Sequence, residues 1–302
     1  MKRKSTNNFL LALTAFIWGS AFVAQSVGMD YLGPFTFNSI RCLMGGIVLI
    51  PVLLLFKRNG RKKSQEQVAE VAGAGIGSRK DLIVGGICCG LALAAGSSLQ
   101  QIGLVYTTAG KAGFITALYI VIVPVMGILL GKRVGLKVWI GVVLAATGMY
   151  FLCITEGFSI AKGDFFVFLC AAAFSVHILV IDSFAPKVDG VALSCIQFFV
   201  CGILCAVPML VSEQPQISQI MEAWVPLAYA GVLSCGVAYT LQVVAQKNTD
   251  PAVASLILSL ESVFSVLAGW VILGERLSGR ELFGCALVFT AVILAQFPEK
   301  AR

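Results

Sequence analysis

Two charged residues stand inside long apolar stretches of the sequence, and their chemistry is the first question. Arg41 is the only charged residue in FTFNSIRCLMGGIVLIPVLLLF, residues 35–56. Glu261 lies about nine residues into another apolar run, 252–273. A guanidinium can bind an anion, and a carboxyl group removed from water favours its neutral form, which suits it to carry a proton or bind an amine. The alternative for each is a fixed structural contact between helices.

Neutral hydrogen-bonding and aromatic side chains accompany these charges. Tyr239, Gln242 and Gln246 recur at i, i+3 and i+7, the spacing of one helix face. Such groups are typical of a small-solute cavity, and the alternative for any one of them is packing or hydrogen bonding between helices. The candidate substrate-binding residues are Trp18, Gln100, Gln101, Thr116, Tyr119, His177, Tyr239, Gln242 and Glu261. The candidate coupling or gating residues are Glu261, Arg41 and Pro124, the last because its ring kinks a helix.

No pattern for nucleotide, metal or nucleophilic chemistry stands beside them. The ten cysteines lie in or at the ends of apolar runs without a CxxC pair, and the single histidine cannot complete a zinc set. VAGAGIGSRK (71–80) lacks the third glycine of a dinucleotide-binding loop, and AGKAG (109–113) lacks P-loop spacing. We therefore expect no cofactor, no metal, no nucleic-acid partner and no enzymatic activity. The remote alternative, a membrane-embedded enzyme, needs a cluster of His, Asp or Cys at one membrane face.

Composition indicates which elements position these residues. Hydrophobic residues make up 58% of the 302, and charged residues make up 12%, against about 25% in soluble domains. Lipid is therefore the expected solvent, and runs of about 20 apolar residues in lipid form helices because no backbone group can stay unpaired there. We predict an all-α integral membrane protein with ten transmembrane helices, at 9–28, 34–56, 82–105, 112–131, 136–154, 164–182, 190–211, 224–246, 252–273 and 280–297.

Lys and Arg are divided unevenly between the two membrane faces. With the N-terminus in the cytoplasm, 17 of the 22 basic residues fall on the cytoplasmic side, most of them at the N-terminus and in the loop 57–81. The positive-inside rule then predicts a multi-pass protein of the cell (inner or plasma) membrane with both termini in the cytoplasm. The net charge of +7 follows from the same bias, with anionic lipid headgroups as its expected contact.

The sequence also matches itself at two offsets. A shift of 156 residues places FNSIRCLMGGI (37–47) over LSCIQFFVCGI (193–203), and Trp18 over Phe174. A shift of 143 residues places GKRVGLKVWIG (131–141) over GERLSGRELFG (274–284). The repeat therefore divides the chain into a first half and a second half of five helices each.

These halves are residues 1–154, with the basic loop 57–81, and residues 155–302. Because five is an odd number, the second half crosses the membrane in the opposite direction to the first. We expect two inverted five-helix repeats, an arrangement that recurs in secondary transporters. In such proteins the two repeats can exchange conformations, which converts the outward-open state into the inward-open state.

Blocks in both halves resemble the EamA type of the drug/metabolite transporter superfamily. They are IWGSAF in span one, SIR in span two, LQQIGLVYTTAGKAGFITALYIVIVPVMGILLG across spans three and four, and SLESVFSVLAGWVILGERLSGRELFG across spans nine and ten. Ser262 is a departure, because the family often has a proline after the span-nine glutamate, here Glu261. The resemblance implies that spans one, three, four, six, eight and nine surround a central cavity, with spans five and ten as outer supports.

Together these observations predict a secondary active transporter or exporter of small organic solutes, such as amino acids or related metabolites, working by alternating access. The alternative in the same class is a proton-coupled multidrug or quaternary-amine exporter, in which Glu261 binds cation and proton in turn. A passive channel is a third reading. The expected partners are a small-molecule substrate, membrane lipid and, in the coupled case, a proton. The short loops are compatible with a monomer and with a homodimer.

Overall fold

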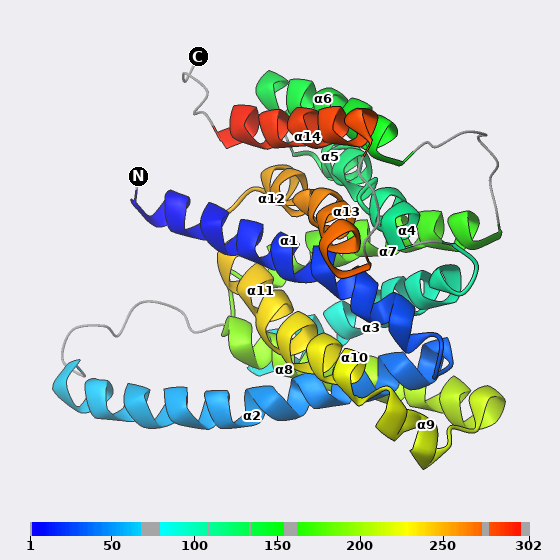
Figure 1. The fold of residues 1–302 in the computed structure, drawn as a ribbon. Helices are drawn as coiled ribbons and strands as arrows, with labels where there is room; N and C mark the ends of the chain where they lie inside the picture. Colours follow the sequence, from blue (N-terminus) through cyan, green and yellow to red (C-terminus); the bar gives the residue numbers. More distant parts are fainter. Residues whose placement is uncertain are drawn as a thin grey trace.

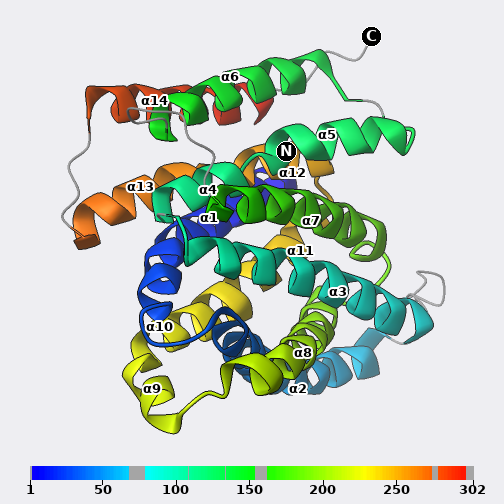
Figure 2. The same cartoon turned by 90° about the vertical axis from the view of Figure 1, so that its right-hand side faces the viewer.

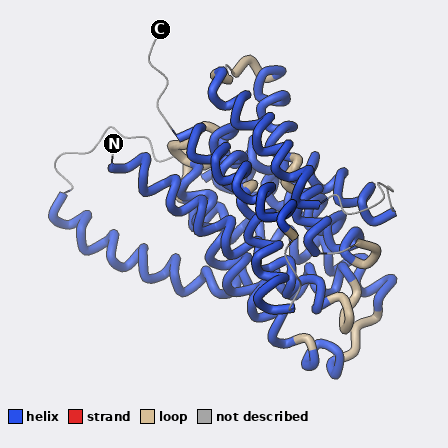
Figure 3. Tube along the Cα trace, turned by 45° about the horizontal axis from the view of Figure 1, so that its top comes forward, coloured by secondary structure: helices blue, strands red, loops and turns tan. Residues whose placement is uncertain are grey.

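The computed structural model describes residues 2–67, 79–107, 109–132, 134–153, 162–273 and 278–296. Within these ranges the chain is a bundle of helices with short connections and no strand (Figure 3). Eight helical segments are long and apolar enough to cross a membrane, and two shorter apolar helices lie at Leu136–Gly148 and Leu282–Leu294. Because these ten segments coincide with the ten predicted runs, the prediction of an all-α, ten-helix membrane fold is confirmed.

Several spans are made of more than one helical piece. The first half contains α1 (Lys2–Gly28), α2 (Pro34–Gln67), α3 (Arg79–Leu104), α4 (Ala109–Thr116), α5 (Tyr119–Leu129) and α6 (Leu136–Cys153). The second half contains α7 (Lys162–Phe184), α8 (Gly190–Pro208), the π-helix η1 (Met209–Glu213), α9 (Ile217–Glu222), α10 (Trp224–Ala228), the π-helix η2 (Tyr229–Tyr239), α11 (Thr240–Gln246), α12 (Pro251–Leu258), α13 (Leu260–Leu273) and α14 (Gly279–Gln296). Spans four, seven, eight and nine are therefore composite.

Two predicted features fall partly outside the described residues. The basic loop 57–81 begins as a continuation of α2, which runs to Gln67 and projects beyond the bundle (Figure 1), and residues 68–78 of the loop are not described. In the GKRV and GERL blocks, residues 133 and 274–277 also lie outside the described ranges.

Reciprocal contacts between α2 and α8 relate the two halves of the chain. The Ser39 hydroxyl donates to the carbonyl of Gly202 at 2.9 Å. The shift of 156 places Cys195 over Ser39 and Gly202 over Gly46. The Cys195 thiol donates to the carbonyl of Gly46 at 3.5 Å. Contacts that repeat when the partners are exchanged are those of a two-fold axis. An internal pseudo-two-fold axis therefore passes between α2 and α8.

The same two glycines explain how closely α2 and α8 approach. A Cβ atom at Gly202 would lie 2.7 Å from Leu43 Cγ, and one at Gly46 would lie 3.1 Å from the ring of Phe199. Leu43 and Phe199 are themselves matched by the shift of 156. Each half thus inserts one large side chain over the glycine of the other, which fixes the register of the two helices.

The remaining contacts follow the same exchange. Span one packs against span nine (α1 with α13), and its counterpart span six packs against span four (α7 with α4 and α5). Likewise, span three packs against span six (α3 with α7), and its counterpart span eight packs against span one (η2 and α11 with α1). The start of α1 and the end of α14 lie on the same side of the bundle (Figure 1), as an even number of crossings requires. α6 and α14 lie side by side at one edge in both views (Figures 1 and 2), the outer position that the resemblance implies for spans five and ten.

Span four is broken just before Tyr119. α4 ends at Thr116 and α5 begins at Tyr119, and the backbone N–H of Ile120 bonds to the carbonyl three residues earlier. Pro124 explains this tightening, because it offers no N–H to the Ile120 carbonyl and its ring crowds that group. The predicted disruption by proline therefore appears as a break one turn ahead of the proline.

Span nine is broken at the matching place without a proline. α12 ends at Leu258 and α13 begins at Leu260, and the shift of 143 places Ser259 over Thr116. The hydroxyls of Ser255, Ser259 and Ser262 each donate to the carbonyl three residues earlier, at 2.7–2.9 Å. Such back-bonding competes with the helical ladder and bends helices. The departure at Ser262 therefore does not remove the break that positions Glu261.

A carboxylate from the second half caps the start of α2. Glu213 accepts hydrogen bonds from the backbone N–H of Phe35 at 2.9 Å and from the N–H and hydroxyl of Thr36, both at 2.6 Å. Since such caps are worth about 0.5–2 kcal/mol, we expect Glu213→Ala to lower the melting temperature of the purified protein by a few degrees. Glu222→Ala, an exposed carboxylate on α9, is the matched control and should leave the melting curve unchanged. Equal melting of the two variants would contradict the capping role.

Candidate functional site

A cavity lies among the helices at the broken parts of spans four and nine. It is lined by Trp18, Phe22, Gln25, Arg41, Gln100, Thr116, Tyr119, Phe174, His177, Ile178, Ser234, Tyr239, Gln242 and Glu261. The space between these side chains is about 450 Å³, including the part that opens to solvent. Its residues come from both halves of the chain, so the site exists only in the folded bundle.

Most of the predicted site residues line this cavity, and two do not. Gln101 is fully buried on another side of α3, with its amide nitrogen 3.6 Å from Met29 Sδ. Pro124 lies within α5 and shapes the break instead of touching the cavity. Five lining residues were not predicted from the sequence, namely Phe22, Gln25, Phe174, Ile178 and Ser234. Of these, Phe174 carried a signal, since it is the repeat counterpart of Trp18.

Arg41 and Glu261 both line the cavity but do not pair with each other. Arg41 is 3% exposed, and its Nη1 donates to Gln25 Oε1 at 2.5 Å. Glu261 is also 3% exposed and lies in the first turn of α13, where the helix dipole favours a negative charge. Ion pairs such as Lys111–Asp164 and Lys132–Asp182 involve other residues. The cavity therefore presents a cation and a carboxyl group that do not neutralise each other directly.

Several buried polar atoms at the cavity have no hydrogen-bond partner among the residues that the structure describes. The donors are Arg41 Nε and Trp18 Nε1, and the acceptor is Gln242 Oε1. The Tyr119 hydroxyl and the Glu261 carboxyl group lie next to each other. Buried polar groups are almost always paired with protein, water or ligand, because an unpaired one costs about 1–3 kcal/mol. These atoms are thus available to a polar solute or to water that a solute displaces.

An aromatic wall stands beside the charged residues. The rings of Trp18 and Tyr239 lie 4.5 Å apart between centroids, and His177 packs edge-on to Tyr239 at 5.9 Å. Phe174 continues this wall from α7, with its ring 6.4 Å from His177. The cavity therefore combines apolar surface with a few placed polar groups, the usual composition of a small-molecule site.

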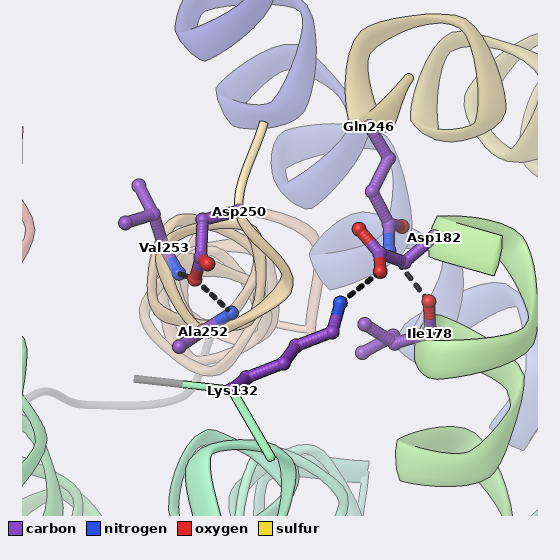
Figure 4. Close-up of polar contacts among 7 residues, drawn as sticks. All are labelled: Lys132, Ile178, Asp182, Gln246, Asp250, Ala252 and Val253. Atoms are coloured by element: carbon purple, nitrogen blue, oxygen red, sulfur yellow. Dashed lines mark hydrogen bonds and ion pairs between the residues drawn. The ribbon is translucent and has the colours of Figure 1, made fainter. Parts of the chain in front are cut away.

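Ties at both ends of α7 hold the helix that carries His177 and Ile178. At its start, Asp164 accepts from Lys111 at 2.6 Å and from Thr107 at 3.0 Å. At its end, Asp182 pairs with Lys132, and Gln246 Nε2 donates to the carbonyl of Ile178 at 2.6 Å (Figure 4). Since Lys111 and Lys132 flank the α4–α5 span, spans four and six run parallel and are fastened together at both membrane faces.

Comparisons with known proteins agree with this fold. The model of a family described as the EamA-like transporter family matches residues 6–154 and 161–297. An uncharacterized transporter of Archaeoglobus fulgidus is 33% identical over 285 residues, which cover 94% of this chain and 83% of that protein. A WAT1-related protein of Arabidopsis thaliana is 22% identical over 94% of this chain and 68% of its own length. One solved crystal structure matches with a TM-score of 0.74 at 19% identity, covering 96% of each chain, a likeness that shows the fold alone.

Proposed function

The chain belongs to the EamA-like transporter family and is a multi-pass membrane transporter, and on that premise we propose that it is a secondary carrier of small organic solutes. The solutes are amino acids or related metabolites, moved by alternating access and not chemically altered. One observation supports this proposal above the others. Unpartnered donors and an unpartnered acceptor, together with a guanidinium and a carboxyl group, line one buried cavity between two inverted halves.

The pair of opposite charges favours a solute that carries both charges. A carboxylate on the solute would bind the Arg41 guanidinium, and an ammonium group would bind Glu261, each as a charge-assisted hydrogen bond. The aromatic wall of Trp18 and Tyr239 would take an apolar part of the solute. A solute that lacks one of the two charges would leave Arg41 or Glu261 buried without a charged partner.

The proton-coupled exporter of organic cations is the second candidate, and the Glu261 carboxyl beside an aromatic wall favours it. Arg41 argues against it, since a permanent cation in the same lining repels a solute with positive charge alone. The proposed orientation, in the cell membrane with both termini in the cytoplasm, rests on the distribution of Lys and Arg.

Counterflow in proteoliposomes tests the proposal. Vesicles preloaded with an unlabelled amino acid should take up the labelled form faster than empty vesicles and then release it, because a carrier exchanges solutes across one site. Thr147→Ala, which removes an exposed hydroxyl of α6 far from the lining, should behave as the unmodified protein. Uptake that does not saturate and is indifferent to preloading, across amino acids and organic cations alike, would show a channel and refute the carrier.

A further inference from the structure

Each half carries one buried hydrogen bond between its first and second spans, at matching positions. In the first half, Arg41 on α2 donates from Nη1 to Gln25 Oε1 on α1 at 2.5 Å. In the second half, His177 on α7 donates from Nε2 to Gln197 Oε1 on α8 at 2.9 Å. The shift of 156 residues places Gln197 over Arg41, and His177 lies one helical turn from the counterpart of Gln25. The two bonds therefore join the same pair of spans in each repeat, with the α7 partner one turn away from the exact counterpart of Gln25.

The inverted arrangement places these two bonds on opposite sides of the membrane midplane. Gln25 and Arg41 lie three residues before the end of α1 and seven residues after the start of α2, near the connection 29–33. His177 lies seven residues before the end of α7, and Gln197 lies seven residues after the start of α8. The connection 185–189 between them lies on the opposite face, because α1 and α7 cross in opposite directions. Gln25, Arg41 and His177 all line the cavity. The Arg41–Gln25 bond therefore lies on the side of the cavity toward 29–33, and the His177–Gln197 bond lies on the side toward 185–189.

The helices that carry the bonds are fastened differently. α7 is tied at both ends, by Lys111–Asp164 and by Lys132–Asp182 (Figure 4). α1 is tied to span eight, because Thr14 donates to the Ala238 carbonyl at 3.2 Å and Ser20 Oγ lies 2.6 Å from the Tyr229 hydroxyl. α2 and α8 are instead joined to each other across the pseudo-two-fold axis by their reciprocal hydrogen bonds. The joined pair, which also packs against η2 and α3, thus faces α1 and α7 at the cavity.

We propose that Arg41–Gln25 and Gln197–His177 are the two gates of the carrier, opened in turn when the α2–α8 pair rocks about its axis. This proposal rests on the proposed carrier function. Rocking one way separates Arg41 from Gln25 and opens the end at 29–33, and rocking the other way separates Gln197 from His177 and opens the end at 185–189. Within the described part of the chain, Arg41 Nε and Gln197 Nε2 have no hydrogen-bond partner, so each gate keeps a donor that an anionic or polar group of the solute can engage as the gate opens.

Side-specific labelling of a cavity cysteine tests the gates. Ser234 lines the cavity, so Ser234→Cys provides a reporter for a membrane-impermeant maleimide, with the unmodified protein as the background. In this reporter, Gln25→Leu should speed labelling from the side of 29–33 by about 10-fold or more, because it removes a charge-assisted bond, and should change it less than about twofold from the other side. Gln197→Leu should speed labelling from the side of 185–189 by about 2- to 12-fold, because that bond is neutral.

Two further variants guard against misfolding, and the outcomes separate the two proposals. If either leucine variant fails to fold, Gln25→Ala and His177→Phe remove the same bonds. Thr147→Ala is the control and should leave both labelling rates unchanged. If both gate variants speed labelling from the same side, or if neither speeds labelling from any side, the gate proposal is wrong. This holds even if counterflow by the unmodified protein supports the carrier. Absence of counterflow in the unmodified protein refutes the carrier and the gates with it.

Discussion

Replacement of Glu261 by glutamine is expected to lower transport at low solute concentration by about 10- to 150-fold. Glu261 is the carboxyl group of the cavity lining, and a hydrogen bond to a charged group contributes about 1.5–3 kcal/mol, or that range of affinity. Glutamine keeps the shape and one acceptor oxygen, so the bundle should still fold. The loss should therefore appear in the half-saturating concentration for an amino-bearing solute more than in protein yield.

The measurement is initial uptake into proteoliposomes at several solute concentrations, for an amino acid and for its analogue without the amino group. Glu222→Gln changes the same chemical group on the exposed surface of α9 and is the matched control. If Glu261 binds the amine, the variant should lose its preference for the amino acid over the analogue. A variant with unchanged kinetics for both solutes, and unchanged dependence on a proton gradient, would exclude Glu261 from binding and from coupling.

The spans could be predicted from the sequence because lipid leaves the backbone few alternatives. An apolar run long enough to cross must be helical, so α1, α3, α6 and α14 end close to the predicted bounds. The two-fold relation was also readable, since the shift of 156 pairs Ser39 with Cys195, and these make the reciprocal bonds between α2 and α8. The length of the apolar runs and the internal sequence repeat thus predict the architecture.

The rotation of each helix could not be predicted in the same way. Gln100 and Gln101 are neighbours in an apolar run, yet Gln100 faces the cavity and Gln101 faces Met29, because adjacent residues on a helix point about 100° apart. Helix rotation is set by packing against neighbours and not by hydropathy. Gln25 was missed for a related reason. It lies near the end of span one, where a polar residue is ordinary, and only its bond to Arg41 places it at the site.

The break in span nine shows how one structural result can arise from different residues. Proline is the familiar cause, and Ser262 stands where proline is common in the family. Three serine hydroxyls bonded to backbone carbonyls bend the chain instead, and Glu261 still lies in the first turn after the break. The position of the carboxyl group is therefore kept although the local chemistry differs.

Arg41→Leu is expected to have the second large effect, on both folding and transport. It removes the guanidinium from the lining and leaves Gln25 Oε1 buried without a donor, at a cost of about 1–3 kcal/mol. We expect a lower yield of folded protein and, in the protein that folds, at least a tenfold weaker apparent affinity for a solute carboxylate. Thermal unfolding in detergent and initial uptake rates measure the two effects separately.

Arg41→Gln separates the structural role of this residue from its role in binding. Glutamine is the residue that the second repeat has at the matching position, Gln197, and its amide can still donate to Gln25, so we expect near-normal melting. The charge is nevertheless gone, so uptake of an amino acid should weaken while uptake of the corresponding amide should change little. Equal transport of both solutes by Arg41→Gln and by the unmodified protein would make Arg41 a purely structural cation. A large loss of folded protein in Arg41→Gln would mean that the bundle requires the charge itself, which the neutral counterpart in the second repeat argues against.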